Sequence, residues 1–112
     1  MYRKLMEMSG EPCYTLTFGR EATMHVDEKE VTIVYPSGND RKIPRVMVEQ
    51  AIGILLKTGR LTVSDVHEGI TNRNGAQTDR LMAVLSKLPG VTDDRRPRVL
   101  YYSSASANEG MA

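Results

Sequence analysis

The fold is decided by residues 61–91, which read LTVSDVHEGITNRNGAQTDRLMAVLSKLPGV. Two helix starts lie in this stretch. Thr62 can accept hydrogen bonds from the backbone N–H groups of a first helical turn, where the carboxylate of Asp65 also favours the helix dipole. Asn74, with Gln77 three residues later, resembles a capping box. The two predicted helices, with a turn between them, span residues 63–70 and 75–88.

A longer helix is predicted just upstream. Pro44 suits the first helical position, where its missing N–H costs no hydrogen bond, and Gly59 suits the left-handed residue that ends a helix. Apolar residues fill most positions between them. We therefore expect a helix over 44–58 that is mostly buried and forms the centre of the core.

Strands are predicted on both sides of this helical region. From Cys13 to Tyr35 apolar and polar residues alternate with a period of two, and the links between the runs are short enough to join only antiparallel neighbours. Pro36 to Asp40 is rich in turn-forming residues. Near the C-terminus a polar stretch leads into a run of branched and aromatic residues. The predicted strands lie near 13–18, 22–26, 31–35 and 98–102.

Length and composition favour one globular domain. The chain has 112 residues, of which 40% are hydrophobic and 26% charged, so we expect a single domain over 13–102. Residues 1–12 are weakly patterned and predict a weakly ordered lead-in, and the small polar residues 103–112 predict a disordered tail. The longest apolar run, 51–56, is far shorter than the roughly 20 residues that cross a bilayer. With no secretory signal in view, we expect a cytoplasmic protein without a membrane partner.

Residues that could carry chemistry are few. Cys13 is the single cysteine, and His25 and His67 are the only histidines. This set excludes an internal disulfide and argues against a soft-metal cluster. The glycines lack the pattern of a phosphate-binding loop. We therefore expect no enzyme activity, no cofactor and no metal.

Charge is informative in its distribution. The net charge of +1 is too small to predict a nucleic-acid partner, but residues 41–60 hold five basic residues against one acidic residue. Arg41, Lys42 and Arg45 lie at the centre of this region, and 95–98 forms a second basic group. Exposed basic residues often serve only to keep a surface solvated.

The order of helix, short helix, turn, helix and hairpin over 43–102 resembles a winged helix-turn-helix domain. The run 61–66 is similar to the entry to the second helix of such domains, and 88–91 with 99–102 is similar to the run from recognition helix to wing. The expected fold class is therefore α+β: a winged helix-turn-helix of three helices plus a C-terminal β-hairpin wing, preceded by an N-terminal antiparallel β-meander.

The resemblance implies a small DNA-binding protein, a transcriptional regulator or a genome-defence factor, whose partner is double-stranded DNA. The helix that starts near Asn74 would enter the major groove, and the hairpin at 92–98 would be the wing. Base edges would be reached by Asn72, Arg73, Asn74, Gln77 and Arg80. Phosphates or the minor groove would be contacted by Arg95, Arg96 and Arg98.

Two questions stay open at this stage. Asp79 lies opposite the apolar stripe of the third helix and would repel phosphate unless it is paired, so an alternative is a winged-helix adaptor that docks a protein in a larger assembly. Convergence of the basic residues on one surface would favour DNA. We also expect a homodimer formed through 13–35 or through Met1–Met8, because one face of the meander must be covered.

Overall fold

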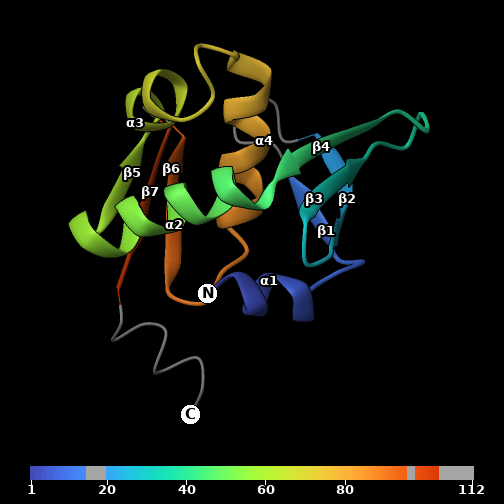
Figure 1. The fold of residues 1–112 in the computed structure, drawn as a ribbon, viewed down its shortest axis with the longest axis horizontal. Coiled ribbons are helices and arrows are strands. Elements are labelled where there is room, and N and C mark those ends of the chain that lie inside the picture. The colour runs from blue at the N-terminus through green and yellow to red at the C-terminus, as the bar shows by residue number, and fades with distance from the viewer. Residues whose placement is uncertain (15–19, 96–97, 104–112) are drawn as a thin grey trace.

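The computed structural model describes residues 1–14, 20–95 and 98–103, and its architecture is α+β. Two antiparallel sheets lie on either side of one central helix, α4 (Figure 1). The first sheet has the order β1-β2-β3-β4. Its strands are β1 (Pro12–Tyr14), β2 (Glu21–Val26), β3 (Glu30–Val34) and β4 (Asp40–Pro44).

The predicted alternation is confirmed in the middle of this sheet. Ala22, Met24 and Val26 of β2 are buried, as are Val31 and Ile33 of β3, so one face of the sheet packs on the core. β1 is observed over Pro12–Tyr14, and the rest of the strand predicted at 13–18 lies outside the described residues.

β4 was not predicted. It pairs along its length with β3, with Ile43 opposite Val31 and Arg41 opposite Ile33. Ile43 is its only buried residue, and a single apolar residue gives no periodicity to detect. The predicted turn is therefore shorter, and the meander has four strands.

The N-terminal lead-in is ordered, contrary to the sequence prediction. Residues Tyr2–Glu7 form α1, and its side chains Tyr2 and Leu5 are 4% and 0% exposed. The Tyr2 hydroxyl donates a hydrogen bond of 2.7 Å to the carbonyl oxygen of Asp27. Tertiary contacts of this kind stabilise a helix that is too short to be stable alone.

The three predicted helices are present with small shifts at their ends. Gly59 has a φ of 78° and ends α2 in the left-handed conformation, as expected. Pro44 precedes the first turn rather than opening it, and the third helix stops at Leu85 rather than near 88. The observed spans are α2 (Arg45–Thr58), α3 (Val63–Gly69) and α4 (Gly75–Leu85).

A second sheet closes the C-terminal part. β6 (Val91–Arg95) and β7 (Arg98–Tyr102) form a hairpin, and β7 also pairs with β5 (Arg60–Thr62). The order is β5-β7-β6, and β5 was not predicted. In the part of the chain that the structure describes, no helix meets the length and apolarity needed to cross a membrane.

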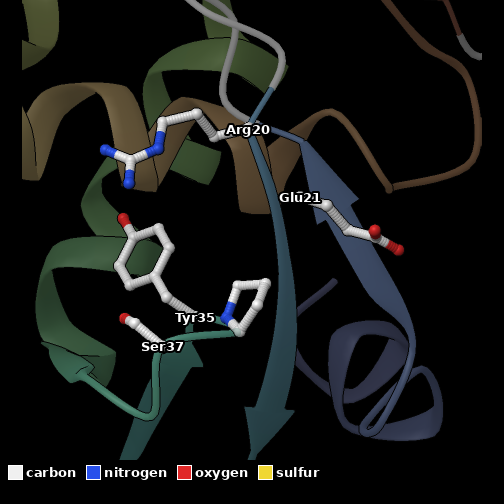
Figure 2. A pocket seen from close by; sticks show the side chains of 5 residues that line it. Arg20, Glu21, Tyr35 and Ser37 are labelled. Carbon is white, nitrogen blue, oxygen red and sulfur yellow. The ribbon is translucent and has the colours of Figure 1, made fainter.

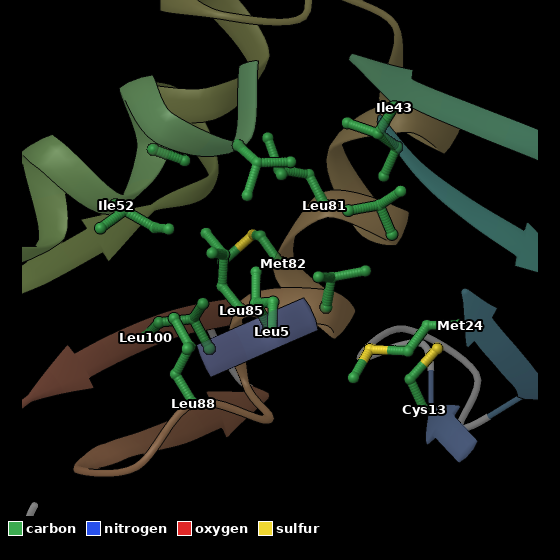
Figure 3. Close-up of a cluster of buried hydrophobic side chains, with 14 of the residues drawn as sticks. Leu5, Cys13, Met24, Ile43, Ile52, Leu81, Met82, Leu85, Leu88 and Leu100 are labelled. Carbon is green, nitrogen blue, oxygen red and sulfur yellow. The ribbon is translucent and has the colours of Figure 1, made fainter. Parts of the chain in front are cut away.

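The core joins both sheets through α4. Leu81, Met82 and Leu85 project from this helix among Ile43 of the first sheet and Leu100 of the second (Figure 3). By contrast, α2 is not the mostly buried helix that its sequence predicts. It buries Val48, Ala51, Ile52 and Leu55 and leaves an exposed face.

Candidate nucleic-acid interface

The turn between α3 and α4 is fixed from within the chain. At the start of α3, Thr62 and Asp65 form the expected N-terminal cap, with each side chain accepting a hydrogen bond from the other residue's backbone N–H. Between the helices, the hydroxyls of Thr71 and Thr78 are 2.7 Å apart and buried. Thr78 also donates to the carbonyl oxygen of Asn74 at 3.0 Å. The geometry of the turn is therefore set by buried hydroxyl groups.

Three predicted contact residues lie on the exposed tip of this turn. Asn72 and Arg73 have φ values of 53° and 67°, in the left-handed region that asparagine tolerates and arginine seldom adopts. Asn74 is also exposed, but its side-chain oxygen accepts a 3.0 Å hydrogen bond from the backbone N–H of Gln77. Asn74 thus caps α4, and Arg73 extends from the tip.

The body of α4 is buried on nearly all sides. Ala83, which the helical wheel places opposite the apolar stripe, is only 1% exposed. A helix needs an open face to enter the major groove, because base edges must come within hydrogen-bond distance of its side chains. Beyond its first turn α4 offers no such face. Its buried residues are Thr78, Leu81, Met82, Ala83, Val84 and Leu85.

The predicted base-reading side chains in α4 are held by the protein itself. Gln77 donates from Nε2 to the carbonyl oxygen of Lys42 at 3.2 Å, which ties α4 to the edge strand β4. Arg80 donates from Nη2 to Oε1 of Gln77 at 2.9 Å. The Nε atom of Arg80 is buried, and no hydrogen-bond partner for it is present in the described residues. Both side chains are therefore engaged in hydrogen bonds within the chain.

Arg98 of the hairpin, which was predicted to contact DNA, also binds a group within the chain. Nη1 of Arg98 lies 3.0 Å from Oδ1 of Asp79, and the two side chains are 27% and 14% exposed. The expectation that Asp79 faces outward is therefore wrong: it turns towards the hairpin and pairs with Arg98. Of the other two wing residues, Arg95 is described only in its backbone, and Arg96 lies outside the described residues.

The cations at the centre of the basic region are engaged locally: Arg41, Lys42 and Arg45 each contact a nearby group. Arg45 binds the carboxylate of Glu49 at 2.7 Å and lies over the ring of Tyr2, 4.4 Å from its centroid. The hydrogen bond to Glu49 raises the pKa of Arg45. Arg41 donates to the carbonyl oxygen of Asp40 at 2.6 Å. These cations, like Arg80, are bound to nearby groups rather than presented together with Arg73.

One surface hollow was missed by the sequence analysis. It is lined by Arg20, Glu21, Tyr35, Pro36 and Ser37, with a volume of about 390 Å³ (Figure 2). The guanidinium of Arg20 lies 5.6 Å from the centroid of the Tyr35 ring. Alternation along the strand predicts that Tyr35 lies on the same face of the sheet as the buried Ile33. This placement of Tyr35 was the only sign of the hollow that the sequence offered.

Cys13 is the one cysteine of the sequence. Cys13 is buried, and burial raises the pKa of its thiol to about 11, so it is a thiol rather than a thiolate at neutral pH. Within residues 1–14, 20–95 and 98–103, no group of three or more His, Cys, Asp or Glu side chains could hold a metal ion.

Comparison with known proteins gives no relative: no family model, no curated protein and no solved structure matches this chain.

Proposed function

We propose that this chain is a winged-helix protein-interaction module that acts as an adaptor in a larger assembly. The order of elements over residues 45–102 supports the winged-helix part of the proposal. Three helices are followed by a hairpin, and the strand between α2 and α3 pairs with the second strand of that hairpin. The three helices followed by a hairpin are the order that the resemblance leads us to expect, and the pairing of β5 with the hairpin was not part of that expectation.

The burial of α4 is the observation that favours a protein-binding adaptor over a protein that reads DNA bases. In a DNA-binding winged helix this helix would present polar side chains to base edges. Here Ala83 is 1% exposed, Gln77 donates a hydrogen bond to β4, and Arg80 donates one to Gln77. If Gln77 turned to contact DNA, its hydrogen bond to Lys42, which joins α4 to the first sheet, would be lost.

The exposed face of α2 is the docking surface we assign to the module. It is defined here as Val46, Glu49, Gln50, Gly53, Leu56 and Lys57. Val46 is 60% exposed and Leu56 is 45% exposed. These two aliphatic side chains would supply the apolar part of an interface, and the polar residues of the face would form its rim.

Fluorescence anisotropy with a labelled mixed-sequence duplex tests this proposal against DNA binding. At about 50 mM salt even non-specific protein–DNA binding is favoured, and we expect no binding by the wild-type chain. Binding that discriminates between duplex sequences, and that Gln77→Ala or Arg80→Ala relaxes, would overturn the proposal.

DNA binding through phosphates alone is the second candidate, and Arg73 is the observation that favours it. This arginine is exposed at the N-terminus of α4, where backbone N–H groups attract anions. If the duplex binds, Arg73→Ala should weaken binding to all sequences about equally, and the slope of log affinity against log salt should fall by about 0.9. Arg3→Ala, which removes an exposed charge from α1, is the matched control and should leave affinity unchanged.

A further inference from the structure

The hollow beside Tyr35 brings together three hydrogen-bond donors from two parts of the first sheet. Arg20 directly precedes β2, Tyr35 directly follows β3, and Ser37 lies in the turn that leads to β4. Figure 2 shows the guanidinium of Arg20 and the hydroxyls of Tyr35 and Ser37 on the same side of β2. The carboxylate of Glu21 points to the other side, as expected for consecutive side chains along a strand. The hollow therefore gathers donors and one positive charge, and its one acidic side chain is directed away.

The chain holds these donors in position. Tyr35 packs against the core. Its backbone N–H donates to the carbonyl oxygen of Asn39, and its carbonyl oxygen accepts from the N–H of Gly38, both at 2.9 Å, which fixes the turn that contains Ser37. In the residues that the structure describes, the hydroxyls of Tyr35 and Ser37 have no hydrogen-bond partner. The guanidinium of Arg20 carries five N–H donors, so it can bind an anion while it stays in contact with the Tyr35 ring.

We propose that this hollow binds the phosphate group of a small phosphate monoester. A guanidinium can bind phosphate through two parallel N–H groups, and the two hydroxyls can donate to the remaining oxygens. Three separate donor groups match the three terminal oxygens of a phosphate monoester, whereas a carboxylate has only two oxygens.

The size of the hollow leaves room for the organic part of the ester. Its volume of about 390 Å³ falls within the range of about 300–1,000 Å³ that is typical of small-ligand sites. The ring of Tyr35 and the ring of Pro36 line it and offer apolar surface beside the three donors. The hollow shares no residue with the α2 face, so this site does not depend on the proposed adaptor function.

A titration of the full chain with phenyl phosphate, followed by ¹H–¹⁵N NMR, tests the site because the spectra report which backbone amides change. At about pH 7.5 the phosphate carries nearly two negative charges. We expect saturable shifts at the amides of Ser37 and Gly38, with a dissociation constant of about 1 mM or below. Inorganic phosphate, which lacks the ring, and benzoate, which has two oxygens, should both bind more weakly.

Three results would overturn the proposal. Benzoate that binds as tightly as phenyl phosphate would remove the preference for phosphate, and inorganic phosphate that binds as tightly would remove the contact with the organic part. Absence of shifts, or shifts centred on residues 74–77 at the N-terminus of α4, would show that the hollow is not the site. The last result would favour the anion site beside Arg73 instead.

Single substitutions test each donor. Arg20→Gln, Tyr35→Phe and Ser37→Ala should each weaken phenyl phosphate binding at least about tenfold, because each removes a hydrogen bond to a charged group. Arg41→Gln and Tyr101→Phe are the matched controls, since they remove the same groups from exposed positions outside the hollow, and they should bind like wild type. Ser37 is exposed, so Ser37→Ala should keep the native circular dichroism spectrum. Equal weakening by Arg41→Gln and Arg20→Gln would mean general attraction to charge and would contradict the proposal.

Discussion

The two longest helices, α2 and α4, differ in how deeply they are buried, and the difference is the reverse of what their sequences suggest. α2 is the more apolar in sequence, yet it leaves Val46 and Leu56 in solvent. α4 is the less apolar of the two and is nevertheless buried from Thr78 through Leu85 apart from Asp79 and Arg80, which are partly covered. The difference teaches that burial here is decided by position: α4 lies between two sheets, whereas α2 lies on the outside of the core (Figure 1).

Truncation of matched leucines should give the largest contrast between the helices. Leu81 of α4 is 0% exposed and Leu56 of α2 is 45% exposed. Leu81→Ala should lower the free energy of unfolding by about 2–5 kcal/mol through lost burial and a cavity, whereas Leu56→Ala should change it by less than about 0.5 kcal/mol. Urea denaturation measures both. Equal losses of unfolding free energy in the two variants would contradict the difference in burial between α4 and α2.

The ion pair between α4 and the hairpin should show a smaller effect. A double-mutant cycle with Asp79→Ala and Arg98→Ala should give a coupling energy of about 1 kcal/mol, because both side chains are partly buried. The pair Lys4–Glu7, with side chains 46% and 60% exposed, is the control and should give only about 0.2–0.5 kcal/mol. If the Asp79–Arg98 coupling does not exceed that of the control, the hairpin is not held to α4 as described.

Alanine substitutions at Gly53 within α2 and at Gly59 just after it should change the free energy of unfolding in opposite directions. Gly53→Ala should raise the free energy of unfolding by about 0.5–1 kcal/mol, because alanine favours the helix and its methyl group meets open space. Gly59→Ala should lower it, since Gly59 has a φ of 78°, which L-residues adopt only with strain. Thermal unfolding followed by circular dichroism measures both. A loss of stability in Gly53→Ala would contradict the open surroundings of Gly53.

Local signals were enough to predict most of the elements. Thr62, Asn74 and Gly59 mark helix ends through interactions within a few residues, and the structure places a helix end at each. Alternation in β2 and β3 predicted the strands and their buried face. The α+β class followed from these elements, and the winged-helix arrangement stays a proposal.

Features that depend on distant contacts could not be predicted. α1 is ordered because Tyr2 and Leu5 meet the core, and β4 exists because it pairs with β3. The intramolecular partners of the predicted site residues could not be predicted for the same reason. Gln77 is bonded to β4, and Arg98 is bonded to Asp79, and no pattern within α4 or the hairpin reveals either partner.

Thiol labelling tests the central claim, the reversed exposure of α4 and α2, most directly. The native Cys13 is buried with a pKa of about 11, so it should react slowly near pH 8 and leave a low background. Ala83→Cys and Gln50→Cys place a second thiol on the supposed reading face of α4 and on the exposed face of α2. Reaction with a disulfide reagent in the folded protein should be fast for Gln50→Cys and close to the wild-type background for Ala83→Cys. Equally fast reaction at both positions, with native circular dichroism spectra, would contradict the account and return α4 to the role of an exposed reading helix.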